Sequence, residues 1–111
     1  MESGQRFAVL VFQKYVEGAD IEERLRDYTD RMLYLIERVG GRIAWSGRPI
    51  GVVAGDSANS WDVVIIVEYP TPEAAMRLTS DPEYIEAMEA RSAAIDRFEI
   101  HACIPVIDAP R

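Results

Sequence analysis

Two short segments without a polar residue place the strongest constraint on the fold. Residues 7–12 (FAVLVF) and residues 63–67 (VVIIV) consist mainly of β-branched and aromatic side chains, which favour strands. Because alternate side chains of a strand point to opposite faces of its sheet, both faces of these strands are apolar. Such a sheet needs cover on both faces. The rest of the chain, or a second molecule, must supply that cover.

Helix and turn signals divide the remaining sequence. Apolar residues recur every three or four positions from 21 to 39, which is typical of an amphipathic helix, and Asp20 has the spacing of a capping box. Thr71 and Asp81 each precede a proline and predict two further helix starts. The expected elements are strands at 7–12, at 42–54 with a break or bulge at 47–49, from 61 or 62 to 69 and at 98–104, and helices at 21–39, about 72–79 and 82–95.

The element order β-α-β-β-α-β predicts an α+β, ferredoxin-like sandwich. In that fold, a four-stranded antiparallel sheet carries its helices on one face. The length predicts a single domain over residues 1–111, with a core from about 6 to 105. Since the helices cover one face, we expect a homodimer in which a second copy covers the other sheet face. The alternative is that a terminal segment folds over that face; we favour the dimer because both termini are short and polar.

Composition excludes several classes of partner. The net charge is −7, Lys14 is the single lysine, and no basic run is present, which argues against nucleic acid and anionic membranes. The longest aliphatic run, 63–67, is far too short to span a bilayer, and the N-terminus lacks a signal-peptide pattern. One cysteine, Cys103, excludes a disulfide framework and suits a reducing compartment. We therefore expect a soluble cytoplasmic protein.

Three motifs in a fixed order resemble one known family. They are residues 40–42 (GGR) after a long helix, residues 67–75 (VEYPTPEAA) after a strand, and residues 81–84 (DPEY) followed by Arg91. Together they resemble the family catalogued as domain of unknown function 1330, in the dimeric α/β-barrel superfamily. The resemblance covers about residues 7–104, although the segment around Trp45 departs from the usual pattern. It implies the fold and the dimer but no reaction, because the superfamily includes cofactor-free monooxygenases, cyclases, isomerases and haem enzymes.

His101 is the candidate catalytic residue. It is the single histidine, and on a strand it shares a face with Glu99. This pattern is typical of a general base that a carboxylate orients. The alternative, which we favour, is a histidine that packs or meets solvent on an edge strand.

Tyr28, Tyr34 and Trp45 are the candidate substrate-binding residues. Tyr28 and Tyr34 lie on or near the predicted buried face of the first helix. In many superfamily members, the resemblance implies, the pocket lies between helices and sheet, where these hydroxyls would bind a phenolic or carbonyl ligand and Trp45 would shape the pocket. The alternatives, which we favour, are core aromatic packing for the two tyrosines and edge or dimer packing for Trp45.

No pattern predicts a metal or a cofactor. One histidine and one cysteine among scattered carboxylates match no metal-ligand spacing, a haem site would depend on His101 alone, and no phosphate-binding glycine loop is present. Three arginines, Arg42, Arg48 and Arg91, have the chemistry to bind a carboxylate, but we expect surface ion pairs.

Two functions remain open. The first is a cofactor-free enzyme, with monooxygenase-, cyclase- or isomerase-like chemistry, that acts on a small apolar organic molecule. The second is a non-catalytic homodimeric module that binds a ligand or serves a structural role. The sequence leaves open whether the protein is an enzyme.

Overall fold

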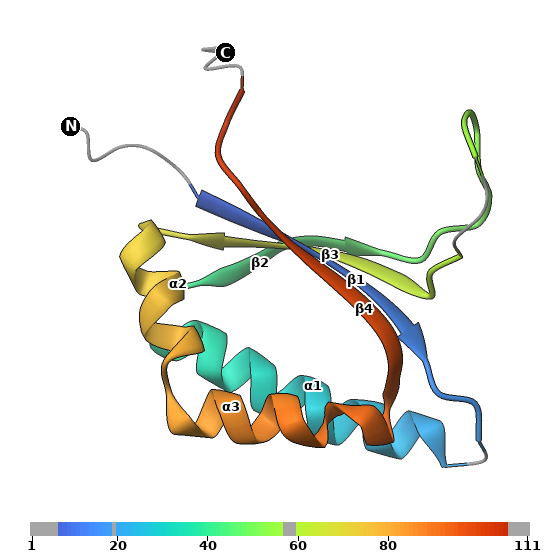
Figure 1. Cartoon of the computed structure of the whole chain (residues 1–111), viewed down its shortest axis with the longest axis horizontal. Helices are drawn as coiled ribbons and strands as arrows, with labels where there is room; N and C mark the ends of the chain where they lie inside the picture. The colour runs from blue at the N-terminus through green and yellow to red at the C-terminus, as the bar shows by residue number, and fades with distance from the viewer. Residues whose placement is uncertain (1–6, 19, 57–59, 107–111) are drawn as a thin grey trace.

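The computed structural model describes residues 7–18, 20–56 and 60–106, which form one sheet with its helices on a single face (Figure 1). The elements in chain order are β1 (Phe7–Tyr15), α1 (Ile21–Arg38), β2 (Arg42–Gly47), β3 (Val63–Tyr69), α2 (Pro72–Thr79), α3 (Pro82–Glu89), the 3₁₀ helix η1 (Ala90–Ala93) and β4 (Ile95–Cys103). The predicted α+β, ferredoxin-like fold with its β-α-β-β-α-β order is confirmed. No helix in these ranges has the length and apolar character that a membrane crossing requires.

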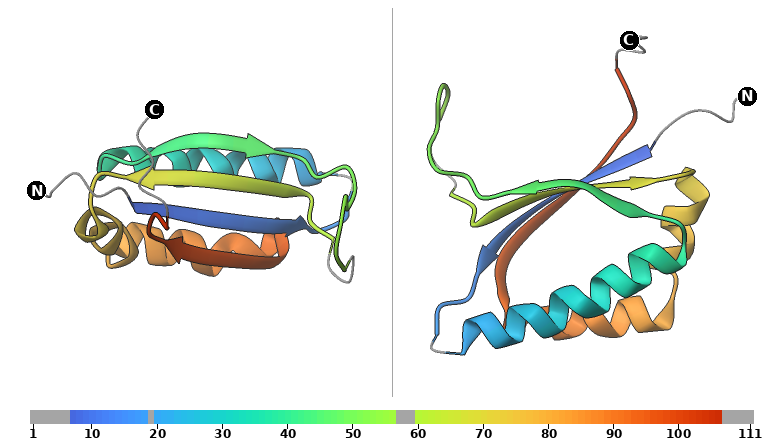
Figure 2. Two further views of the ribbon diagram at one scale, coloured as in Figure 1. Left: turned by 90° about the horizontal axis from the view of Figure 1, so that it is seen from above. Right: turned by 180° about the vertical axis from the view of Figure 1, so that it is seen from behind.

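The sheet is antiparallel throughout, with strand order β2-β3-β1-β4. The two apolar strands, β1 and β3, lie at its centre, and β2 and β4 form its edges (Figure 2). Leu10 of β1 pairs with Ile66 on one side and with His101 on the other. The central position of β1 and β3 explains why their sequences are apolar on both faces.

The predicted second strand was too long. β2 ends at Gly47, and residues 48–56 form no strand, because Pro49 has no N–H to donate to a ladder. β2 lies at one edge of the sheet, where a strand that is followed by a proline is tolerated. Its irregularity lies between Ile43 and Trp45, earlier than the predicted break at 47–49.

The outer two strands also differ from the prediction at their ends. β1 continues to Tyr15, and β4 begins at Ile95, because Tyr15 and Ile95 pair beyond the end of the apolar run. As a consequence, α3 stops at Glu89 and the short η1 leads into β4. The apolar pattern marked the buried part of each strand, whereas the hydrogen-bonded ladder is longer.

Helix starts follow the predicted capping in two of three cases. The Thr71 hydroxyl accepts a hydrogen bond from the Ala74 amide at 3.1 Å, and the Asp81 carboxylate accepts one from the Glu83 amide at 2.8 Å. Asp20 precedes α1 but forms no cap, because its carboxylate bonds the Arg24 guanidinium instead. The predicted capping box at Asp20 was therefore wrong.

The hydrophobic core is small and lies toward the α2 end of the molecule. Its buried side chains come from α1, β3 and the α2–α3 pair: Leu35, Ile36, Val67, Tyr69, Ala74, Leu78 and Ala87. The alternation of the strands divides the sheet into two faces. Val9, Ile65 and Phe98 point toward the helices, whereas Leu10 and Ile66 point to the opposite face.

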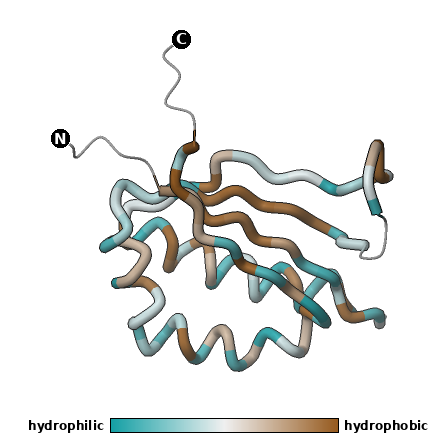
Figure 3. The backbone as a smooth tube through the Cα atoms, turned by 45° about the horizontal axis from the view of Figure 1, so that its top comes forward, coloured by the Kyte–Doolittle hydropathy of each residue, from teal (hydrophilic) through white to brown (hydrophobic). Residues whose placement is uncertain are grey.

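No element of the described chain covers that opposite face, which we call the open face (Figure 2). Hydropathy colouring shows the two central strands as strongly apolar along most of their length (Figure 3). Cover by a terminal segment, the alternative to the dimer, would involve residues 1–6 or 107–111, which lie outside the described residues.

Gly41 offers a test of the close packing between α1 and β3. A Cβ added at Gly41 would lie 2.8 Å from Tyr69 Cε1 and 2.9 Å from Ile36 Cγ2, both in the core. We expect Gly41→Ala to lower the free energy of unfolding by about 1–3 kcal/mol, because a packed core must shift. Urea denaturation followed by circular dichroism measures the loss.

Gly51→Ala is the matched control, since a Cβ at Gly51 would meet no atom within 4 Å. We expect it to change stability by no more than about 0.5 kcal/mol. Equal stability of the two variants would contradict the close approach of Gly41 to Tyr69.

Candidate functional site

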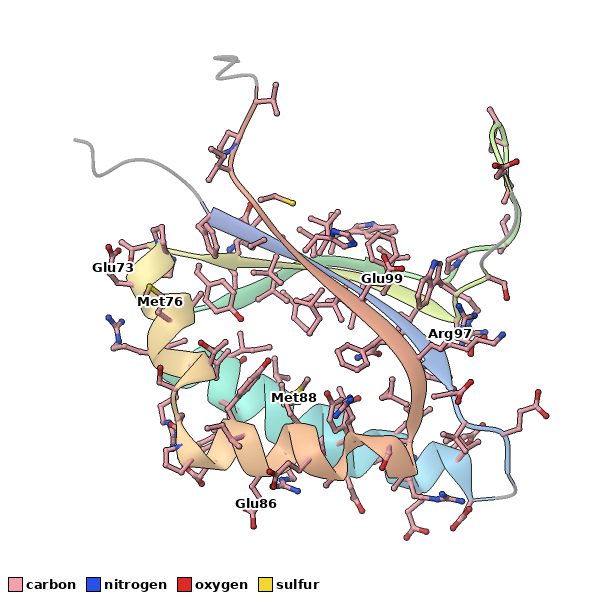
Figure 4. All side chains as sticks on the ribbon, in the orientation of Figure 1. Glu73, Met76, Glu86, Met88, Arg97 and Glu99 are labelled. Atoms are coloured by element: carbon pink, nitrogen blue, oxygen red, sulfur yellow. The ribbon has the colours of Figure 1, made fainter. Side chains whose placement is uncertain are left out.

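A large apolar cavity lies between the sheet and the helices. Its volume is about 450 Å³. The sheet contributes one face of each strand to the lining, including Val9, Ile65 and Phe98, and the helices contribute Met32 and Met88 among others. Figure 4 shows Met88 pointing from α3 into the space between helices and sheet, whereas Glu86 points away from it. The cavity exists because side chains on facing layers do not meet here.

Polar groups gather where α1 and α3 face each other. The Tyr28 hydroxyl donates to Met88 Sδ at 3.6 Å, and Arg91 Nη1 donates to the Met88 carbonyl at 2.6 Å. The Arg91 guanidinium lies over the Phe98 ring, 4.3 Å from its centroid. Tyr84, seven residues before Arg91, also lines the cavity. A cation and two phenols thus border a mainly apolar space.

Burial controls the ionisation of these phenols. Burial raises the pKa of Tyr28 to about 12, with a further increase from Tyr84 and a decrease from the Arg91 guanidinium. Burial also raises the pKa of Tyr84, which Arg91 again opposes. Tyr69, on the β3 side of the cavity, has its pKa raised to about 12 by burial and by Tyr84. All three hydroxyls are therefore neutral donors at physiological pH.

Of the predicted substrate-binding residues, Tyr28 lines the cavity and Tyr34 and Trp45 do not. Tyr34 is 59% exposed and lies against the Arg38 guanidinium, 5.3 Å from its ring centroid. Six helical positions after Tyr28 correspond to a rotation that carries Tyr34 off the buried stripe. Trp45 pairs with Ile66 on the open face and is 56% exposed, because the irregularity in β2 turns it away from the helices.

His101 lies on the open face, across the sheet from the cavity. Its Nε2 is 2.9 Å from Glu99 Oε1, and its ring packs edge-on against Phe12 with centroids 5.7 Å apart. The pairing of His101 with Glu99 on an edge strand is thus present, and Figure 4 shows Glu99 on the side away from the helices. However, His101 and Tyr28 point to opposite sides of the sheet. The structure therefore does not unite the predicted catalytic and substrate-binding residues.

Sequence reasoning missed Tyr84, Met88 and Arg91 as members of one site. Arg91 was expected in a surface ion pair, as Arg42 is with Glu68 at 2.7 Å. Within the described chain Arg91 forms no ion pair and faces the cavity instead. A signal was available, because Tyr84, Met88 and Arg91 follow each other at helical spacings of four and three.

Within the described residues, no three or more histidine, cysteine, aspartate or glutamate side chains form a group that could hold a metal ion. Cys103 is half-buried on the open face, with Sγ 3.7 Å from the His101 carbonyl.

Solved structures support the fold. A Rhodopseudomonas palustris protein of unknown function is 25% identical, with a TM-score of 0.77 over 94% of this chain and 85% of that one. A hydroxynitrile lyase from Passiflora edulis is 11% identical, with a TM-score of 0.70 over 96% and 99%. A dimeric protein of unknown function with a ferredoxin-like fold, from Bacteroides fragilis, is 11% identical, with a TM-score of 0.53 over 90% and 96%.

None of the curated proteins matches this chain. The family described as domain of unknown function (DUF1330) matches residues 12–100, most of the chain. This match confirms the resemblance seen in the sequence motifs, and the chain belongs to the DUF1330 family.

Proposed function

We propose that this protein is a homodimer that binds a small, largely apolar organic molecule between its helices and its sheet. The cavity of about 450 Å³ carries the proposal. Small-molecule sites typically measure about 300–1,000 Å³ and combine an apolar lining with a few polar groups. The lining here has that composition, with Tyr28, Tyr84 and Arg91 as polar members of an otherwise mainly apolar set.

The energetics of the cavity also favour an occupant. Its lining exposes mainly apolar side chains, and the hydrophobic effect would favour an apolar occupant that removed this surface from water. The adjoining core includes two small side chains, Ala74 and Ala87, beside larger ones such as Leu35. Bulkier residues at the lining positions would fill the space and raise stability. A ligand explains why the sequence leaves the space open.

The open face supports the dimer. Leu10, Phe12, Val64 and Ile66 are half-buried there with no described segment over them, and Trp45 is 56% exposed beside them. Polar pairs border this apolar centre: Glu99 and His101 lie on the edge strand β4, and Arg42 of the edge strand β2 pairs with Glu68 of β3. An apolar centre with a polar rim is the usual anatomy of a protein interface.

The segment after β2 supports the same assembly. Residues 48–56 rise beyond the sheet on the open side (Figure 1). Their apolar side chains are strongly exposed, with Ile50 and Val53 at 100% and 103%. Exposed aliphatic side chains beside an apolar face extend the area that a second copy can bury.

Catalysis is a second candidate function. Tyr28 and Tyr84 are neutral donors beside a permanent cation, and such groups in an apolar site stabilise an enolate or a phenolate that forms during a reaction. Cofactor-free isomerisation or cyclisation would use them. Because His101 lies on the open face, the acid–base role predicted for it would not contribute to a reaction in the cavity. The acidic net charge and the single cysteine support a cytoplasmic location.

The ligand proposal predicts that toluene, a neutral apolar probe, binds in the cavity. We expect toluene to shift the methyl signals of Met32 and Val67 in two-dimensional NMR spectra, with an affinity in the millimolar range or better. Ala75 lines the cavity, so Ala75→Phe should weaken binding about tenfold by filling the space. Ala90 is exposed and lies outside the lining, so Ala90→Phe should leave affinity unchanged. Shifts confined to Leu10 and the open face would contradict the proposal.

The dimer proposal predicts a mass of twice 12.5 kDa by size-exclusion chromatography with light scattering. We expect Ile66→Glu to weaken the dimer about a hundredfold or more, because an unpaired carboxylate would be buried at the centre of the interface.

Ile85→Glu is the matched control, since Ile85 is 46% exposed on α3 and does not line the cavity. It should leave the mass unchanged. A monomeric wild-type protein, or equal effects of the two substitutions, would count against the open face as the interface.

A further inference from the structure

The charge of the cavity is concentrated in one residue. Of the described residues that line it, Arg91 alone carries a charge, and no aspartate or glutamate is among them. A cation in an apolar site is stable only where hydrogen bonds or an opposite charge compensate for lost hydration. The contacts of Arg91 therefore show how far the protein itself compensates for this charge.

The protein holds Arg91 in place but leaves its charge without a counterion. Nη1 donates to the Met88 carbonyl at 2.6 Å, and the guanidinium plane rests on Phe98. Within the described chain, its other N–H groups have no acceptor and the guanidinium has no ion pair. These contacts fix the orientation of the guanidinium while most of its donors remain available.

The Tyr28 hydroxyl is a neutral hydrogen-bond donor that lies near this cation. Its hydroxyl is directed at Met88 Sδ, 3.6 Å away, and a thioether is a weak acceptor that a stronger one displaces readily. Tyr84 lies one helical turn before Met88 on α3 and also lines the cavity. Three donors thus meet at one end of the cavity, and none of the lining groups there is an anion.

We propose that the cavity selects a small carboxylic acid, whose carboxylate binds Arg91 and the Tyr28 and Tyr84 hydroxyls while its apolar body lies between Val9, Ile65 and Met32. This inference rests on the proposed ligand-binding function and names the substrate class of that site. The planar guanidinium fork matches the geometry of a carboxylate. A single cation balances a monoanion, whereas a phosphate dianion would leave excess negative charge in an apolar space.

The test compares 4-phenylbutanoate with 4-phenylbutanamide, which has the same shape but no charge. Isothermal titration calorimetry of the full chain gives both affinities, and competition with toluene places the acid in the cavity. We expect the acid to bind about tenfold to a hundredfold more tightly than the amide, the range for a hydrogen-bonded charge pair. This comparison needs only the wild-type protein.

Variants then assign the effect to Arg91. Arg91→Met should remove the preference, so that acid and amide bind within about twofold of each other, while Arg91→Lys, which keeps the charge but loses the fork, should retain part of the preference. Arg77→Met removes the same charge from an exposed position of α2 outside the lining, and should preserve the preference. Circular dichroism confirms that each variant is folded.

The outcomes separate this inference from the proposed function. Equal wild-type affinities for acid and amide, with toluene still bound, would overturn the carboxylate and leave the ligand cavity intact. A preference that survives Arg91→Met would overturn the role of Arg91. Failure of the acid, the amide and toluene alike would overturn both proposals.

Discussion

The structure depends on the pairing of β1 with β3, the two strands whose side chains are apolar on both faces. Their register, with Leu10 opposite Ile66, places one set of aliphatic residues toward the helices and the other on the open face. No choice of register could hide both sets, because adjacent residues of a strand always diverge. The helices solve half of this problem by covering one face. The uncovered open face is the physical reason for the proposed dimer.

The cavity follows from how the helices cover their face. The buried core lies where Leu35 and Ile36 of α1 meet Val67 and Tyr69 of β3. Beyond this contact, the lining side chains of the two layers stand apart and border a partly open space of about 450 Å³. Among the described lining residues, the charged one is Arg91, which the Met88 carbonyl of α3 and the Phe98 ring of β4 hold in place. Core and cavity are therefore consecutive parts of one interface between helices and sheet, one part packed and the other open.

Sequence reasoning recovered the fold and the element order, and it placed Tyr28 on the buried face of α1, because periodicity reports which face of a helix is buried. It did not recover the faces of Trp45 and His101. Which face a strand residue lies on depends on the register of the strand with its neighbour. Because β1 and β3 are apolar on both faces, their sequences do not show which residues of β2 and β4 face the helices. An irregularity such as the one between Ile43 and Trp45 reverses parity and has no clear sequence mark. Arg91 was assigned to the surface because most arginines lie there, a statistical reason that contacts override.

The cavity and the proposed dimer face use opposite sides of the same strands, so they are mechanically linked. Val9 lines the cavity, while its neighbour Leu10 lies on the open face, and the same alternation relates Ile65 to Ile66. A second copy that fixes the open face limits how far these strands bend, and strand curvature sets the distance from sheet to helices. Association would therefore hold the cavity at a defined width before a ligand arrives, which lowers the ordering cost of binding. A small domain with a modest core would gain from the proposed dimer, because one symmetric contact would stabilise the fold and preorganise the site together.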